Sequence, residues 1–218
     1  MLPVILFVAA YLIGSIPFSF LVARVMAGKD VREHGSRNVG ATNVARTAGR
    51  LAGVLALLLD LTKGWLTIVV ARAIILHPAW PFAAGAELWQ MREMWIAVAG
   101  IVGVLAHMFP VWLRFHGGKG VATSAGILLA LDPIVLLGAI LVFAIVLLAF
   151  RYVSLASILT AASVPVLFRF LVPGPPFWRI VMSIVIALAV ILKHQSNIAR
   201  IVNGTERKLG QPRKEEER

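Results

Sequence analysis

The sequence predicts an all-α polytopic membrane protein with seven transmembrane helices, its N-terminus outside and its C-terminus in the cytoplasm. Of its 218 residues 60% are hydrophobic and only 14% are charged, and the mean hydropathy is +0.89. A soluble domain has about 45–50% apolar and about 25% charged residues. A water-soluble fold of this composition would therefore have too little polar surface to cover itself. The absence of cysteine also excludes a disulfide scaffold and thiol chemistry.

Seven apolar runs along the chain account for the seven predicted helices. A membrane-spanning helix needs about 20 largely apolar residues. The predicted helices cover residues 2–23, 51–76, 94–113, 119–131, 133–150, 153–171 and 177–193. The runs are separated by charged residues or by proline and glycine, which end helices.

Three of these runs need separate justification. The first carries no charge and follows no basic segment, so it predicts a span rather than a cleaved signal peptide. Asp132 and Pro133 separate the fourth run from the fifth, and a Val-Pro-Gly-Pro-Pro segment at 172–176 separates the sixth from the seventh. The fourth run is short, and it also fits a re-entrant hairpin.

The distribution of basic residues predicts the orientation. With seven spans and a cytoplasmic C-terminus, sixteen of the 21 Lys and Arg residues fall inside, four fall outside, and Lys63 lies within a span. Cytoplasmic loops collect Lys and Arg, and a fourth run that failed to cross would put the basic C-terminal segment outside. The net charge of +11 therefore needs no nucleic-acid partner. Residues 1–210 are expected to form one transmembrane domain, and residues 211–218 a disordered tail.

Under this topology three polar clusters share the cytoplasmic side. They occupy residues 33–46, 116–123 and 193–206. The outer loops, including the long segment 77–93, contain little besides proline, tryptophan and a few charges. Any chemistry is therefore expected on the cytoplasmic side.

The second cluster contains Gly117, Gly118, Lys119 and Gly120 directly before an apolar run. Successive glycine N–H groups can converge on an anion, and both the helix N-terminus and the Lys119 ammonium add positive charge. This pattern favours a phosphate site, although Val121 follows Gly120 and the spacing is not that of a P-loop. The same residues also fit a flexible turn with an ordinary cytoplasmic lysine.

The first cluster combines small polar side chains with glycine and arginine. Its candidate binding residues are Ser36, Asn38, Gly40, Thr42 and Asn43, flanked by Arg37 and Arg46. Guanidinium groups beside small hydrogen-bonding side chains favour a phosphate-bearing ligand. The same residue types form turns and helix caps, so Thr42 or Asn43 could merely begin the second predicted helix.

The third cluster places His194 three residues before Asn197, so the two share a face if the helix continues. An interfacial histidine can also be a simple solvated end residue. His107, alone in the third run, is expected to pack between helices. Because no histidines and carboxylates have metal-ligand spacing, no metal and no other cofactor is expected.

Asp60 and Lys63 lie inside the second predicted helix, three residues apart on one face. Unpaired charges at such depth cost several kcal/mol. We expect the two side chains to neutralise each other and to tie helices together, and the alternative is that Lys63 reaches a ligand.

Together the three clusters resemble the motifs of the bacterial acyl-phosphate:glycerol-3-phosphate acyltransferases, small membrane enzymes that make lysophosphatidic acid. The matching segments are GSRNVGATNVAR at 35–46, GGKGVAT at 117–123 and KHQSNIARIVNGTE at 193–206. They occur in the order of the family, and the number of spans agrees over essentially the whole chain. The outer segment 77–93 and the acidic end of the tail depart from the family pattern.

The resemblance implies transfer of an acyl group from acyl phosphate to the 1-hydroxyl of glycerol-3-phosphate in phospholipid biosynthesis. It implies that Ser36 and Arg46 are essential, that the glycine-rich block binds the glycerol-phosphate, and that His194, Asn197 and Glu206 matter for activity or integrity. The substrate-binding residues it suggests are Asn38, Gly40, Thr42, Asn43, Gly117, Gly118, Lys119, Gly120 and Glu206, and the catalytic residues are Ser36, Arg46, His194 and Asn197.

The resemblance also implies a place in the cell and a set of partners. The enzyme would lie among the lipids of the bacterial inner membrane, its site would face the cytoplasm, and another enzyme would supply the acyl phosphate. An acyl phosphate is already activated, so the protein must supply positioning, charge neutralisation and oxyanion donors rather than a covalent intermediate. Either His194 or a substrate phosphate could accept the proton of the attacking hydroxyl, and the sequence leaves both open.

A transporter or channel for an organic phosphate is the alternative function. It would need polar residues along a path at mid-depth, whereas only Asp60, Lys63 and His107 lie deep in the predicted spans. Two other enzyme classes lack their motifs here. No aspartate lies five positions after any histidine, and no clustered aspartates mark a metal-dependent phosphatidyltransferase.

Overall fold

The computed structural model describes residues 1–81 and 88–211, and within these ranges all regular structure is helical. The helices are α1 (Leu2–Ser15), α2 (Phe18–Ala27), α3 (Ala41–Ala48), α4 (Arg50–Ile75), α5 (Leu88–Met108), α6 (Val121–Leu131), α7 (Pro133–Phe150), α8 (Val153–Leu171), α9 (Phe177–Lys193) and α10 (Gln195–Val202), with one 3₁₀ turn, Val111–Leu113. The predicted tail 211–218 lies, after Gln211, outside the described residues.

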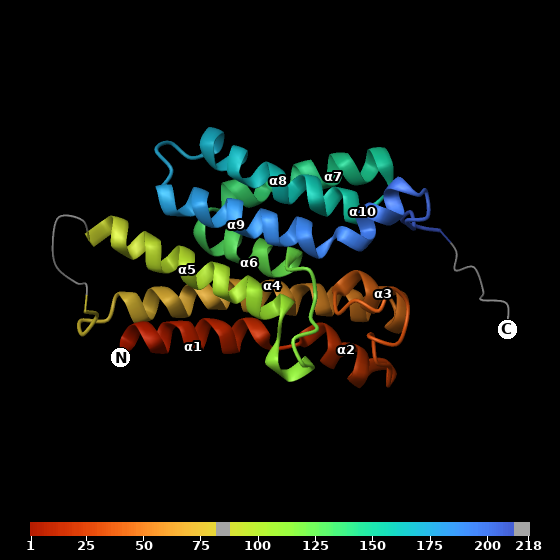
Figure 1. The fold of residues 1–218 in the computed structure, drawn as a ribbon, viewed down its shortest axis with the longest axis horizontal. Helices are drawn as coiled ribbons and strands as arrows, with labels where there is room; N and C mark the ends of the chain where they lie inside the picture. Colours follow the sequence, from red (N-terminus) through yellow and green to blue (C-terminus); the bar gives the residue numbers. More distant parts are fainter. Residues whose placement is uncertain (82–87, 212–218) are drawn as a thin grey trace.

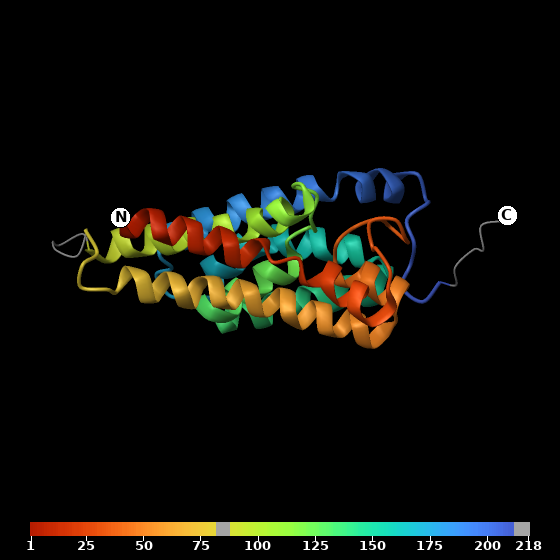
Figure 2. The ribbon, with the colours of Figure 1, turned by 90° about the horizontal axis from the view of Figure 1, so that it is seen from below.

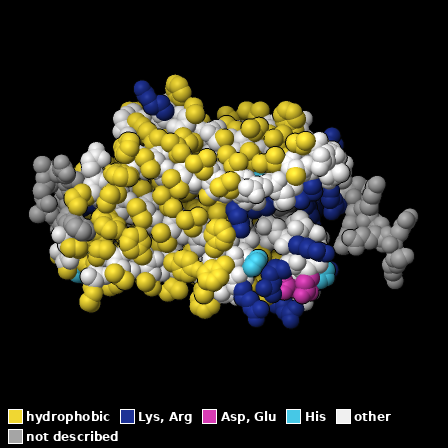
Figure 3. Space-filling model, in the orientation of Figure 1, with side chains coloured by type: hydrophobic (Ala, Val, Ile, Leu, Met, Phe, Trp, Pro, Cys, Tyr) yellow, Lys and Arg dark blue, Asp and Glu magenta, His cyan; other side chains and the backbone are white. Residues whose placement is uncertain are grey.

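The long helices run side by side along one axis of the molecule (Figure 1). Met1 lies toward one end, and α2, α3 and α10 gather at the other, as a second view confirms (Figure 2). Hydrophobic side chains cover most of the visible face, whereas Lys and Arg side chains concentrate toward the end formed by α2, α3 and α10 (Figure 3). This separation is the one expected of a bundle with one basic, water-facing end.

Five helical segments are long and apolar enough to cross a membrane. They are Leu2–Ala27, Arg50–Ile75, Trp89–Leu113, Pro133–Phe150 and Val153–Leu171, and α9 with α10, bent by 57°, makes a sixth if the pair is one span. The prediction of an all-α membrane protein therefore agrees with the structure in its coarse form. The described helices support five or six spans by length and composition, against the seven predicted.

The first predicted span, 2–23, is two helices rather than one. Helix α1 ends at Ser15, and α2 begins at Phe18 after Ile16 and Pro17. Proline has no N–H to continue the helical ladder, and at the break the Ile16 carbonyl accepts hydrogen bonds from the Phe18 N–H at 3.0 Å and from the Lys63 ammonium at 2.7 Å. The break therefore turns a backbone acceptor toward the interior of the bundle.

Helix α6 explains the shortness of the fourth predicted run. Its 11 residues extend about 16 Å, roughly half of the ~30 Å hydrocarbon thickness. The loop between α5 and α6 lies partway along the bundle, short of the end where α3 and α10 lie (Figures 1 and 2). Helices α5 and α6 thus enter from one end and return to it as a pair. The orientation of the C-terminal segment therefore does not depend on whether the fourth run crosses.

A buried polar network joins the N-terminal helices, as expected from Asp60 and Lys63. The Asp60 carboxylate lies 2.8 Å from the Lys63 ammonium and accepts a hydrogen bond from the Ser19 hydroxyl at 2.7 Å. The His107 ring lies 3.7 Å from the same carboxylate. All four side chains are buried, so the prediction that Asp60 and Lys63 neutralise each other and tie helices is confirmed.

A second buried ionic cluster lies at the opposite end of the bundle. The Arg179 guanidinium bonds to the Glu93 carboxylate at 2.7 Å and to the Asp132 carboxylate at 2.8 Å. It links α9 with α5 and with the turn between α6 and α7. This cluster holds the α5 and α6 pair in place at the end remote from the polar clusters.

Candidate active site

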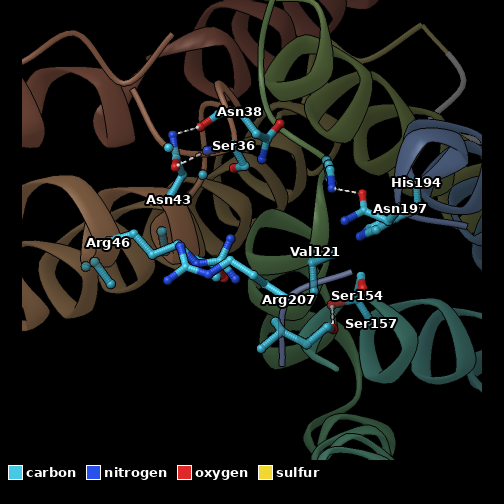
Figure 4. A pocket seen from close by; sticks show the side chains of 18 of the residues that line it. Ser36, Asn38, Asn43, Arg46, Val121, Ser154, Ser157, His194, Asn197 and Arg207 are labelled. Atoms are coloured by element: carbon cyan, nitrogen blue, oxygen red, sulfur yellow. Dashed lines mark hydrogen bonds between the residues drawn. The ribbon is translucent and has the colours of Figure 1, made fainter. Parts of the chain in front are cut away.

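A cavity of about 1760 Å³ collects the three polar clusters of the sequence. It lies among α3, the start of α6, α10 and the segment that follows α10 (Figure 4). Of the residues predicted from the sequence, its wall includes Ser36, Asn38, Gly40, Thr42, Asn43, Arg46, Lys119, Gly120, His194, Asn197 and Glu206. Gly117 and Gly118 do not line it.

Asn43 organises the first loop and uses its whole side chain to do so. Its amide oxygen accepts a hydrogen bond from the Ser36 N–H at 2.9 Å. Its amide nitrogen donates to the carbonyls of Val31, His34 and Asn38 at 2.8–3.0 Å. Asn43 is 1% exposed. The side chain therefore stabilises the loop, and both of its polar atoms are bonded there; the expected substrate contact stays a prediction.

Ser36 and Arg46 differ from Asn43 because their side chains are available to a ligand. Within residues 1–81 and 88–211, neither the Ser36 hydroxyl nor the Arg46 guanidinium has a hydrogen-bond partner. Burial and the nearby Arg207 guanidinium lower the pKa of Arg46 from its ordinary value, which still leaves it a cation at neutral pH. Ser36 in the loop and Arg46 in α3 thus present a hydroxyl group and an unpaired positive charge to the cavity.

The glycine-rich loop does not keep all of its backbone N–H groups free for an anion. The Gly117 and Gly118 N–H groups donate at 3.2 Å to the carbonyls of Met108 and His107 in α5. A Cβ atom at Gly118 would collide with the His107 ring and the Val39 carbonyl. These two glycines therefore allow close packing, and the expected phosphate contact through their N–H groups is replaced by bonds within the fold.

The end of that loop retains the features of an anion site. Gly120 precedes α6 with φ +84°, a conformation that L side chains rarely adopt. The first N–H groups of α6 have no partner inside the helix. Val121 and Ala122 line the cavity, so the N-terminus of α6 faces the space beside Lys119.

A chain of hydrogen bonds connects the second cluster to the third. The Lys119 ammonium donates to the Asn197 amide oxygen, and the Asn197 amide nitrogen donates to the Glu206 carboxylate at 2.7 Å. Burial lowers the pKa of Lys119 to about 8. Lys119 is therefore a cation at neutral pH that can lose its proton in mildly alkaline solution.

Glu206 is a hub of the third cluster rather than a free carboxylate. It accepts hydrogen bonds from the Ser154 hydroxyl at 2.6 Å, from Asn197, and from the Arg200 guanidinium at 2.7 Å. Burial alone would raise the pKa of Glu206, but these three donors outweigh it and lower the pKa below the usual value. A carboxylate with both oxygens occupied stabilises the site and does not readily take up a proton.

His194 lies at the break between α9 and α10, and it is 3% exposed. Its Nδ1 atom lies 2.8 Å from the Val190 carbonyl, so Nδ1 carries the proton of the neutral ring and Nε2 is the acceptor. Burial, with help from the Lys119 charge, lowers the pKa of His194 to about 4. The ring is therefore neutral at physiological pH and a weak base.

Three residues of the cavity were missed by reasoning from the sequence. Arg207 reaches in from the segment after α10, and Ser154 and Ser157 come from the start of α8 (Figure 4). Arg207 directly follows the GTE motif, which was the available signal. The two serines lie in an apolar run and carry no distinguishing pattern.

The cavity wall carries the positive charges and hydroxyl groups that phosphate groups require. Arg46, Lys119 and Arg207 supply positive charge, and Ser36 and Thr42 supply hydroxyl groups. No described side chain activates Ser36 as a nucleophile. Among the described residues no three His, Asp or Glu side chains are grouped to hold a metal ion. Val54, Leu57 and Phe143 add an apolar section to the wall.

Comparisons with known proteins agree on one family. A family model described as glycerol-3-phosphate acyltransferase matches residues 4–204. Curated relatives named glycerol-3-phosphate acyltransferase include one from Geotalea daltonii, 40% identical over 93% of this chain and 95% of its own, and one from Desulforamulus reducens, 42% identical over 95% and 96%.

Two solved structures resemble the chain in fold and sequence. Both are described as PlsY, an integral membrane glycerol 3-phosphate acyltransferase. The glycerol 3-phosphate form has a TM-score of 0.81 and 37% identity, and covers 95% of this chain and 96% of its own. The lysophosphatidic acid form has a TM-score of 0.78 and 36% identity, and covers 95% of each chain.

Proposed function

Because the chain belongs to the glycerol-3-phosphate acyltransferase family, we propose that it transfers an acyl group from acyl phosphate to the 1-hydroxyl of glycerol-3-phosphate, releasing lysophosphatidate and inorganic phosphate. The observation that carries this proposal is the meeting of Arg46, Lys119 and Arg207 around one cavity that also has an apolar wall. Two phosphorylated substrates, one with an acyl chain, match that combination of charge and apolar surface. Membership of an acyltransferase family leaves no ground for the transporter alternative.

The proposed reaction needs binding and orientation more than chemical groups of the protein. The 1-hydroxyl oxygen of glycerol-3-phosphate attacks the acyl carbonyl carbon, a new ester bond forms, and the bond from that carbon to the phosphate oxygen breaks. Arg46 and Lys119 neutralise the phosphate groups. The Ser36 hydroxyl and the first N–H groups of α6 are the candidate donors to the oxyanion.

The proton of the attacking hydroxyl goes to a substrate phosphate in this proposal. A pKa of about 4 makes His194 a weak base at neutral pH, and the Glu206 carboxylate already accepts three hydrogen bonds. A phosphate monoester has a second pKa of about 6, which is better matched to accepting a proton at neutral pH. His194 then positions substrate through its Nε2 atom, and Asn197 positions Lys119.

The proposed topology has seven passes, α5 and α6 counted as one each, with Met1 outside and α10 in the cytoplasm of a bacterial inner membrane. If α5 and α6 formed a re-entrant pair instead, the number of passes would be five and the direction of every other helix would be the same. The concentration of Lys and Arg at the end with α2, α3 and α10 supports a cytoplasmic site (Figure 3). An enzyme that makes acyl phosphate would supply the donor at that side.

The test supplies the full chain, in lipid vesicles, with glycerol-3-phosphate and three donors in turn: acyl phosphate, acyl-CoA and acyl carrier protein loaded with the same chain. We expect equal amounts of lysophosphatidate and inorganic phosphate with acyl phosphate. We also expect the rate to persist in a chelator, because no described group of carboxylates and histidines has metal-ligand geometry. Product formation with acyl-CoA but not with acyl phosphate would refute acyl phosphate as the donor. Loss of activity in a chelator, restored by a divalent ion, would refute the metal-free mechanism.

A further inference from the structure

Two arginine side chains approach each other from opposite walls of the cavity. Arg46 comes from α3, and Arg207 comes from the segment that follows α10, so they are far apart in the chain. Figure 4 shows both side chains reaching toward the middle of the cavity. They are close enough for the Arg207 charge to lower the pKa of Arg46.

No carboxylate of the described chain pairs with either arginine. Glu206 is the nearest candidate in sequence, but its oxygens are bonded to Ser154, Asn197 and Arg200. The single described hydrogen bond from the Arg207 guanidinium goes to the Gln211 carbonyl at 3.1 Å. Most of the five N–H donors of this guanidinium therefore stay available to a ligand.

The fold holds Arg207 in this position. The backbone N–H of Leu209 donates to the Arg151 carbonyl at 2.7 Å, and the Arg151 guanidinium donates to the Leu209 carbonyl at 3.0 Å. Glu206, one residue before Arg207, is tied to α8 and α10. The segment is thus anchored on both sides of Arg207, as a binding residue requires.

Arg207 differs from the basic residue beside it, although both line the cavity. The segment is mostly exposed, but Arg207 itself is half-buried. The next residue, Lys208, instead places its ammonium over the Tyr152 ring, 5.5 Å from the ring centroid. An ordinary cytoplasmic basic residue would extend into water, whereas Arg207 turns inward toward a second cation.

We propose that Arg207 is a substrate-binding residue that, with Arg46, clamps a phosphate dianion between two guanidinium groups. Like charges at close range oppose each other, and a bound dianion reverses the sign of that interaction. Guanidinium groups match phosphate oxygens in bidentate geometry. This inference rests on the proposed function, because the dianion is the phosphate of glycerol-3-phosphate or of the acyl phosphate.

The first test uses the wild-type chain in vesicles and phenylglyoxal, which modifies arginine side chains. Modification of Arg46, Arg207 and the exposed Arg24 is followed by mass spectrometry, without substrate, with glycerol-3-phosphate, or with acyl phosphate. We expect one substrate to slow modification of both Arg46 and Arg207 by at least about fivefold, with Arg24 unchanged. The protecting substrate identifies the source of the phosphate. An Arg207 rate that neither substrate changes would overturn the proposal without any mutation.

The second test is kinetic and compares Arg207→Gln, Arg207→Lys and the control Arg24→Gln. Arg207→Gln should raise KM for the protecting substrate by at least about tenfold, which is about 1.4 kcal/mol. KM for the other substrate should change by less than about threefold. The KM of Arg207→Lys for the protecting substrate should lie between those of Arg207→Gln and the wild type, because lysine keeps the charge and loses the bidentate geometry. Equal losses in both KM values with unchanged protection patterns would identify Arg207 as a structural clip and overturn the clamp. A wild-type chain that makes no lysophosphatidate would refute the proposed function separately, since protection by glycerol-3-phosphate does not require turnover.

Discussion

The amide oxygen of Asn43 accepts a hydrogen bond from the backbone N–H of Ser36 at 2.9 Å. The two residues are seven positions apart in the chain, and the bond closes the loop that presents Ser36 to the cavity. The Asn43 amide nitrogen binds three further carbonyls of the same loop. The position of the Ser36 hydroxyl therefore depends on a side chain whose own polar atoms are bonded within the loop.

Asn43→Asp tests this dependence with almost no change of shape. The carboxylate still accepts from Ser36, but its second oxygen replaces an N–H donor and faces the carbonyls of Val31, His34 and Asn38. We expect a loss of roughly 1–3 kcal/mol of stability from the unsatisfied groups and a fall in kcat of at least about tenfold. Thermal unfolding in detergent and initial rates measure the two effects. Asn203→Asp, at an exposed position, is the control, and an Asn43→Asp enzyme with normal rates would contradict the role given to Asn43.

Ser36→Ala tests whether the Ser36 hydroxyl contacts the reacting groups or only supports the fold. The hydroxyl lines the cavity without a partner in the described chain, so its removal should not disturb the fold. Loss of an oxyanion donor typically costs about a hundredfold or more in kcat. We expect such a fall with KM for glycerol-3-phosphate changed by less than about threefold. Ser196→Ala, on the exposed side of α10, should match the wild type, and normal turnover in Ser36→Ala would move the catalytic centre elsewhere.

The lowered pKa of Lys119 predicts that activity falls in alkaline solution. Burial lowers its pKa to about 8, the Glu206 charge opposes this, and Arg200, Arg46 and Lys193 reinforce it. Below that pH the ammonium is charged and can bind phosphate, and above it the charge is lost. The value of kcat/KM, which reports the free enzyme, should therefore fall by about tenfold for each pH unit above about 8. Lys119→Arg should move the fall to higher pH, whereas Lys29→Arg should not. A Lys119→Arg profile identical to that of the wild type would assign the limit to another group.

Asp60→Asn should destabilise the bundle because it leaves the Lys63 ammonium buried without its counter-charge. Removing one partner of a buried ion pair costs about 3–5 kcal/mol, and both side chains are only 2% exposed. The double variant Asp60→Asn, Lys63→Met removes the stranded charge and should recover much of the loss. Thermal unfolding in detergent, followed by size-exclusion chromatography, measures both. A single variant as stable as the wild type would show that the pair does not hold the helices together.

Single cysteines test the proposed topology directly, since the chain contains none. Asn203→Cys and His77→Cys both lie at exposed positions, at opposite ends of the bundle. In intact cells an impermeant thiol reagent should label position 77 and not position 203, because the proposed topology puts the C-terminal segment in the cytoplasm. Permeabilised cells should label both. Labelling of position 203 in intact cells would invert the topology and place the site outside.

Helix boundaries follow from the sequence wherever a local signal ends an apolar run. Pro133, Pro176 and the polar residues near Arg151 give helices α7, α8 and α9 with the predicted bounds. The break at Pro17 was missed because hydrophobic residues continue on both sides of it. The amphipathic helix α3 was missed because its eight residues look like the rest of a polar loop.

The convergence of the three clusters was also predictable, but the direction of individual side chains was not. An asparagine such as Asn43 and a glycine such as Gly118 look the same in sequence whether they face a ligand or their own backbone. Only the carbonyl groups brought near them by folding decide between the two. Arg207 was missed for the converse reason, because it resembles the other basic residues of a cytoplasmic segment.

The apolar section of the cavity wall, made by Val54, Leu57 and Phe143, bears on where the product goes. Each methylene group kept out of water contributes about 0.8 kcal/mol, so an acyl chain that lies along this wall would lose that stabilisation by entering the cytosol. In the proposed reaction, lysophosphatidate would instead move laterally into the surrounding lipid leaflet. It would then reach the next enzyme by diffusion in two dimensions, while inorganic phosphate, the other proposed product, returned to the aqueous side.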